Sequence, residues 1–146
     1  DTIICFGNTI VHLLNDDDIR QFLRAAYHAL APDGTLTIQL LNYRHIVENQ
    51  IKSLPLIDNE QVTFERSYAF TQDSELIDFN TRLTVKATGQ VIENSIKLYA
   101  IKQDKLHALL SETGFTGLEY FGNFERESLK ADSLPLIVSG RKLLNK

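Results

Sequence analysis

The sequence predicts an α/β fold in which a parallel sheet with a helical crossover is interrupted by a long antiparallel insertion. Residues 2–6 form a short, almost wholly apolar run, which is typical of a strand buried on both faces. A helical pattern over residues 15–30 and a second apolar strand over 35–41 follow, so a right-handed crossover should make the two strands parallel. Three stretches between residues 62 and 100 alternate with a period of two instead, which predicts antiparallel strands.

The first predicted strand ends at Gly7-Asn8, where small residues allow the backbone to turn. In open α/β sheets, ligands bind in the crevice beyond the carboxyl ends of such strands. We therefore expect a site around Phe6, Gly7, Asn8 and His12. His12 is the candidate catalytic residue, because an imidazole can orient an amine or hydroxyl or take a proton from it. The alternative is a histidine packed at the start of a helix or loop.

The predicted helix begins at Asn15 or Asp16, because either side chain can cap the free N–H groups at its start. The Ala-Pro-Asp-Gly sequence at 31–34 ends this helix and turns the chain into the second strand. Residues 46–59 predict a short helix and a loop, with Pro55 marking the break.

A second group of polar residues follows the second strand, again at a carboxyl end. Asn42, Tyr43 and Arg44 are candidate substrate-binding residues, and the alternative is a polar loop with a surface tyrosine. Arg66 is a further candidate, because it interrupts the apolar face of the first antiparallel strand and an unpaired buried charge is costly. It either binds a substrate carboxylate or phosphate, pairs with an acid such as Asp78, or lies at a solvated strand end.

The α/β pattern returns after residue 101. Asp104 is expected to cap a helix that Gly114 ends, and strands are expected over 115–121 and 134–139. Hairpin turns are expected at Asp73-Ser74 and Thr88-Gly89. The predicted organisation is one domain, 1–146, with an α/β core of 1–45 and 102–146 and an antiparallel lid of 60–101.

Composition restricts the function further. The net charge of −4 over 146 residues argues against a nucleic-acid or anionic-membrane partner, which would require a basic face. No apolar run has the roughly 18 to 20 residues of a membrane span. Cys5 is the single cysteine, which excludes an internal disulfide or a cysteine metal cluster and makes a reducing cytoplasm the expected location. We expect no metal, because the histidines lack ligand spacing.

Two ordered sets of residues resemble a known family. The series Gly7-Asn8-Thr9 and His12-Leu13, then Leu-Ala-Pro-Asp-Gly-Thr-Leu at 30–36, resembles the second half of class I S-adenosylmethionine-dependent methyltransferases. The tail, with Gly114-Phe115, the sequence Tyr-Phe-Gly at 120–122 and a final apolar strand, resembles the last helix and the sixth and seventh strands of that family. The antiparallel insertion resembles the lid of small-molecule enzymes such as the glycine and amino-sugar N-methyltransferases.

The resemblance implies the C-terminal half of a Rossmann-like methyltransferase sheet with an inserted antiparallel β-meander. It implies S-adenosylmethionine as cofactor, with Phe6, Gly7 and Asn8 at its methionine part, and methyl transfer to a small-molecule nucleophile by in-line positioning. The family's glycine-rich turn is missing from this sequence. We therefore expect the chain to begin at the fourth strand of the family's sheet and to be inactive alone.

The expected truncation would leave the strand over residues 2–6 with a bare apolar edge, which invites pairing with another chain. We expect either a second copy, giving a dimer, or a missing N-terminal segment to cover it. Two other functions remain open: a non-catalytic α+β binding or dimerisation module, and half of a nicotinamide-dependent Rossmann enzyme. The Pro-Asp-Gly turn and the last strand argue against the latter.

Overall fold

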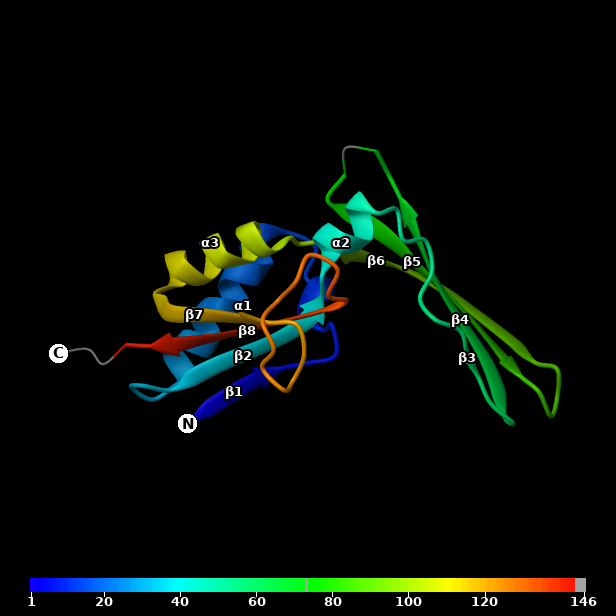
Figure 1. Ribbon diagram of the computed structural model, residues 1–146, viewed down its shortest axis with the longest axis horizontal. Coiled ribbons are helices and arrows are strands. Elements are labelled where there is room, and N and C mark those ends of the chain that lie inside the picture. Colours follow the sequence, from blue (N-terminus) through cyan, green and yellow to red (C-terminus); the bar gives the residue numbers. More distant parts are fainter. Residues whose placement is uncertain (73, 144–146) are drawn as a thin grey trace.

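The computed structural model describes residues 1–72 and 74–143, which form two four-stranded sheets. The body sheet has the order β1-β2-β8-β7, and the lid sheet has the order β3-β4-β5-β6. In Figure 1 the lid sheet extends away from the body, at the end of the body sheet opposite both chain termini. The body strands are β1 (Thr2–Cys5), β2 (Thr35–Leu41), β7 (Phe115–Phe121) and β8 (Pro135–Lys142). The lid strands are β3 (Ile57–Asp58), β4 (Val62–Phe70), β5 (Leu76–Val85) and β6 (Val91–Tyr99).

The parallel pairing of β1 and β2 is confirmed, with a register from Thr2 opposite Thr35 to Cys5 opposite Ile38. Strand β8 lies between β2 and β7 and runs antiparallel to both. The prediction that β1 is buried on both faces is wrong for the described residues. Exposure alternates along it, and Ile4 is 61% exposed, because both long helices of the body lie on one side of the sheet (Figure 1).

The helices are η1 (Ile10–His12, a 3-10 turn), α1 (Asp16–Ala29), α2 (Tyr43–Glu48) and α3 (Gln103–Thr113). As predicted, Asn15 caps α1, where its Oδ1 accepts a hydrogen bond from the Asp18 N–H at 2.9 Å. The predicted cap of α3 is wrong, because Lys102 is the cap residue and Asp104 lies inside the first turn. Gly114 ends α3 with φ +107°, a left-handed conformation that suits a residue without Cβ.

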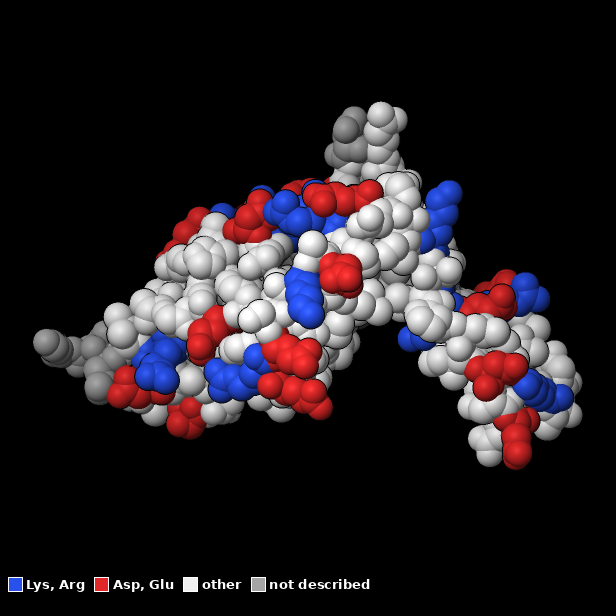
Figure 2. All heavy atoms as spheres, viewed as in Figure 1, with Lys and Arg blue, Asp and Glu red and all other residues white. Residues whose placement is uncertain are grey.

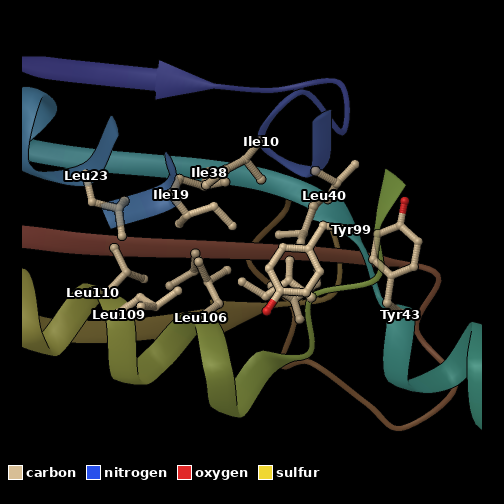
Figure 3. Close-up of a cluster of buried hydrophobic side chains, with 14 of the residues drawn as sticks. Ile10, Ile19, Leu23, Ile38, Leu40, Tyr43, Tyr99, Leu106, Leu109 and Leu110 are labelled. Atoms are coloured by element: carbon tan, nitrogen blue, oxygen red, sulfur yellow. The ribbon is translucent and has the colours of Figure 1, made fainter. Parts of the chain in front are cut away.

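The core lies between β2, β8 and the two long helices (Figure 3). Alternate residues of β2, namely Leu36, Ile38 and Leu40, are at most 1% exposed and contribute one side of it. The helices contribute the other side through apolar residues at helical spacing. Burial of each such side chain contributes about 1.5 to 3 kcal/mol, so this stripe is the main reason the helices dock.

The three predicted antiparallel strands are confirmed as β4, β5 and β6, whose ladders continue without a register shift. One face of this sheet, called here the inner face, carries Tyr68, Ile77 and Leu98, which are buried in the core. The opposite outer face is mostly polar, except at its end near the body, where Leu76 and the buried Tyr99 join the core. The lid begins before residue 60, because β3 pairs with β4 and Ser53 forms a bridge with Ser67. The predicted turn at Asp73 falls outside the described residues.

Candidate functional site

The turn after β1 has a left-handed conformation, and both of its residues bond to Gln39 of β2. Gly7 has φ +74° and Asn8 has φ +61°, a region that glycine and asparagine enter at little cost. The Gly7 N–H donates to Gln39 Oε1 at 2.7 Å, and the Asn8 N–H donates to the Gln39 carbonyl at 3.2 Å. The carboxyl ends of β1 and β2 are thereby joined.

The Asn8 side chain extends this connection to α2. Its Oδ1 accepts a hydrogen bond from the Leu41 N–H at 3.0 Å, and its Nδ2 donates to the Tyr43 hydroxyl at 2.7 Å. Tyr43 is 1% exposed, and burial raises the pKa of its hydroxyl. The phenol therefore stays neutral and serves as a fixed hydrogen-bonding group.

The lid sheet reaches the same place through Tyr68, on its inner face. Tyr68 is 4% exposed, and its hydroxyl has no hydrogen-bond partner among the described residues. Burial raises the pKa of Tyr68, while the neighbouring Tyr43 and the Arg66 guanidinium oppose that rise. Asn8, Tyr43, Tyr68 and Arg66 thus form a series of polar groups from the turn to the lid.

Arg66 lies on the inner face two residues before Tyr68. Its Nη2 donates to the Pro55 carbonyl at 2.8 Å, and its guanidinium lies 5.7 Å from the centre of the Phe64 ring. Its Nε is buried and has no partner among the described residues. The carboxylate considered as an alternative partner, Asp78, pairs with Lys97 at 2.6 Å instead.

The turn is open to ligands on its outer side. A Cβ built at Gly7 would meet only Thr9 Oγ1, at 3.9 Å, so nothing fills the space beside this backbone. Phe6 is 37% exposed and packs edge-on against Phe124, with 5.1 Å between ring centres. An apolar wall therefore stands next to an accessible backbone.

Three candidate residues lie apart from this group. His12 is exposed in η1, and no side-chain hydrogen bond involves it in the described part of the chain. Asn42 is 6% exposed; its side chain caps α2, and its Nδ2 donates to the Ser133 carbonyl at 3.0 Å. Arg44 is directed at Asp104, with 3.1 Å between Nη2 and Oδ1.

Two residues of the site were not among the candidates. Gln39 holds the turn, and its signal was a polar residue at the centre of an apolar strand. Tyr68 was grouped with the apolar face of its strand, because a tyrosine in an alternating pattern gives no indication of an unpaired hydroxyl.

A cavity of about 1110 Å³ reaches one end of this polar series. It is lined by residues 53–56 and by β4, β5 and β6, and its lining includes Arg66, Thr81 and Asn94 but no residue of the Gly7–Asn8 turn. The described residues hold no cluster of three or more potential metal ligands. Nor does any helix within 1–72 and 74–143 have the length and apolar character needed to cross a membrane. On the face shown in Figure 2, basic and acidic side chains are interspersed.

No family model matches the sequence. The chain is 29% identical over 127 residues to a glycine/sarcosine/dimethylglycine N-methyltransferase from Actinopolyspora halophila, covering 86% of this chain and 21% of that protein. It is 28% identical over 134 residues to a glycine/sarcosine N-methyltransferase from Halorhodospira halochloris, covering 90% of this chain and 47% of that protein. The chain therefore spans less than half the length of these curated relatives.

Solved structures of methyltransferases share the fold of this chain. A S-adenosylmethionine-dependent methyltransferase from Clostridium acetobutylicum superimposes with a TM-score of 0.83 at 12% identity, covering 99% of this chain and 58% of that one. The CcbJ methyltransferase from Streptomyces caelestis superimposes with a TM-score of 0.80 at 18% identity, covering 98% of this chain and 57% of that one. An S-adenosylmethionine-bound amino pentose methyltransferase from Micromonospora echinaspora superimposes with a TM-score of 0.66. The resemblance to class I S-adenosylmethionine-dependent methyltransferases and the partial Rossmann-like fold are confirmed.

Proposed function

We propose that the native protein carrying this chain transfers a methyl group from S-adenosylmethionine to a small-molecule nucleophile. One observation carries the proposal: the left-handed Gly7–Asn8 turn, at the carboxyl end of a parallel strand, is tied to Tyr43 and lies beside the inner face of the lid. The printed activities of the curated relatives favour a nitrogen as the methylated atom.

The bound cofactor would supply an activated methyl group on a sulfonium. Phe6, Gly7 and Asn8 would hold its methionine part, and the open space beside Gly7 fits a ligand that approaches the backbone closely. Because the donor is already activated, the protein's contribution is positioning and the exclusion of water. The hydrogen bonds of Asn8 fix the turn, and the apolar residues Tyr68, Ile77 and Leu98 of the lid would help to exclude water from the bound methyl group.

His12 remains the proposed group that accepts a proton from the nucleophile, since its imidazole is exposed just beyond the turn. Asn42 would act by fixing the start of α2 and so the position of Tyr43. Arg44 would contact a substrate only after leaving Asp104 and Glu48, so it is the weakest of these candidates.

Calorimetry with S-adenosylhomocysteine tests the proposal in the native protein. We expect saturable binding that Gly7→Val weakens at least about tenfold, because the new side chain occupies the open space and strains the turn. Gly89→Val is the matched control, since Gly89 also has positive φ, +70°, but lies in the lid hairpin with nothing near its Cβ. Absence of binding in the unmodified protein would favour a non-catalytic binding module.

We also propose that the free edge of β1 pairs with a second copy of the chain or with another segment. Among the described residues only β2 pairs with β1, so the other edge of β1 has unpaired backbone groups. Beside this edge, Ile4 is 61% exposed on the sheet face away from the helices. Sedimentation velocity should show a concentration-dependent dimer that Ile4→Lys abolishes. A monomer at all concentrations would exclude the second copy as partner.

A cytoplasmic location is part of the same proposal. It is supported by the single cysteine, Cys5, which forms no disulfide. Burial raises the pKa of the Cys5 thiol, so it resists conversion to the reactive thiolate. Fluorescence imaging of the tagged native protein would test the location.

A further inference from the structure

The charges of the lid sheet are sorted between its two faces. Strands β4, β5 and β6 carry five charged residues on the outer face, three acidic and two basic, and each basic residue pairs with a carboxylate there. Arg82 lies between two carboxylates from the neighbouring strands, and Lys97 pairs with Asp78. The outer residues are Glu65, Asp78, Arg82, Glu93 and Lys97. Arg66 is the one charged residue on the inner face of these strands.

The inner face also holds two polar atoms whose hydrogen-bonding capacity is unused. Arg66 Nε and the Tyr68 hydroxyl are the buried side-chain nitrogen and oxygen atoms without partners in the described residues. Both belong to β4, two residues apart, so they project from the same face. Buried polar groups in proteins are normally paired, and an exception calls for an explanation.

The chemistry of the two atoms limits what would pair with them. The guanidinium Nε–H is a donor only, and the tyrosine O–H can donate as well. A group that accepts from both and carries negative charge satisfies them best, and a carboxylate is the smallest such group. The neighbours of Arg66 across the sheet, Thr81 and Asn94, are uncharged and do not compete for the guanidinium.

A ligand has a route to this position. Arg66 is half-buried, Thr81 is partly exposed and Asn94 is exposed at the free edge of β6. The cross-strand row of these three residues therefore leads from solvent to the guanidinium. From there, Tyr68 and Tyr43 continue the polar series to Asn8 at the turn.

We propose that Arg66 and Tyr68 form a binding site for a carboxylate group of the methyl acceptor. The identification of the ligand as the methyl acceptor rests on the proposed function, whereas the site itself consists of lid residues alone. It assigns the substrate to small molecules that carry a carboxylate in addition to the methylated atom. Tyr68 contributes as a hydrogen-bond donor and Arg66 as both donor and counter-charge.

The test is a titration of the native protein and of each variant with acetate, measured by calorimetry. In the unmodified protein the ¹⁵N signal of Arg66 Nε reports in addition where acetate binds. Methylammonium and inorganic phosphate are titrated in parallel, each with and without S-adenosylhomocysteine. We expect saturable binding of acetate, no response to methylammonium, and weaker binding of phosphate. Arg66→Gln should weaken acetate binding at least about tenfold, and Tyr68→Phe should weaken it several-fold, since charge-assisted hydrogen bonds are lost.

Arg82→Gln is the matched control, because it removes a guanidinium from the outer face of the same sheet and should leave acetate binding unchanged. If Arg66→Gln does not fold, Arg66→Lys replaces it and should also weaken binding. An equal effect of Arg82→Gln, or no acetate binding at all, overturns the proposal, and tighter binding of phosphate overturns the carboxylate assignment. If the protein binds S-adenosylhomocysteine but not acetate, this site alone is rejected. If it binds acetate but not S-adenosylhomocysteine, the proposed function alone is rejected.

Discussion

Replacement of Asn8 by alanine should be among the most destabilising single changes near the turn. Asn8→Ala removes two side-chain hydrogen bonds, from the Leu41 N–H and to the Tyr43 hydroxyl. It also leaves an alanine at φ +61°, where a Cβ meets the following carbonyl oxygen.

The magnitude follows from these contacts. Each lost hydrogen bond costs about 1 kcal/mol, and the left-handed conformation costs alanine about 1 kcal/mol more. We therefore expect the free energy of unfolding to fall by about 3 kcal/mol. Asn8→Gly keeps the conformation accessible and should lose only about 2 kcal/mol. Tyr43→Phe leaves the Asn8 Nδ2 unpaired and should lose about 1 kcal/mol, because Tyr43 is 1% exposed.

Urea denaturation of Asn8→Ala, Tyr43→Phe and the variant that carries both changes measures the coupling between the two side chains. Because Asn8 and Tyr43 share one hydrogen bond of 2.7 Å, the double variant should lose about 1 kcal/mol less than the two single losses together. Losses that add within about 0.3 kcal/mol would refute the claim that this bond joins the turn to α2.

Two further predictions concern the body of the fold. Gly114→Ala should lower the free energy of unfolding by about 2 kcal/mol and Gly89→Ala by about 1 kcal/mol. Both glycines have positive φ, but only a Cβ at Gly114 meets Tyr27, at 3.3 Å. Equal shifts of the urea midpoint in the two variants would contradict this. The pKa of Asp16 is lowered, chiefly by the hydrogen bond from Tyr99, so its contribution is present above the ordinary value of 3.8 and is lost as pH falls below it. Asp16→Asn should therefore reduce stability at pH 7 by about 1 kcal/mol and flatten the pH dependence below 3.8, as measured by thermal unfolding across pH; an unchanged acid profile would show that the carboxylate is not involved.

The elements of the fold were predictable because each depends on local pattern. The three antiparallel strands between residues 62 and 100 were predictable, since strict alternation has few other interpretations. The predicted start of a helix was less accurate where a capping side chain determines it. Helix α2 begins at Tyr43 rather than near residue 46, because Asn42 accepts a hydrogen bond from the His45 N–H. Strand β3 was missed, since its two residues pair only after β4 is in place.

The candidate site was predictable in outline and not in detail. Gly7 and Asn8 were identifiable because a small-residue turn after an apolar strand marks a carboxyl end. The separation of Asn42 and Arg44 from that turn depends on a loop near Ser133 and on α3, both distant in sequence.

By itself, the sequence determined the order of strands and helices, the antiparallel insertion and the turn at Gly7, because periodicity and turn chemistry act over a few residues. Tertiary structure alone decided that Tyr68 of the lid meets Tyr43 of the body, that Arg66 has no carboxylate among the described residues, and that Ile4 is exposed. The physical reason is that satisfaction of a buried polar group, or cover for an apolar one, depends on neighbours brought together only by packing.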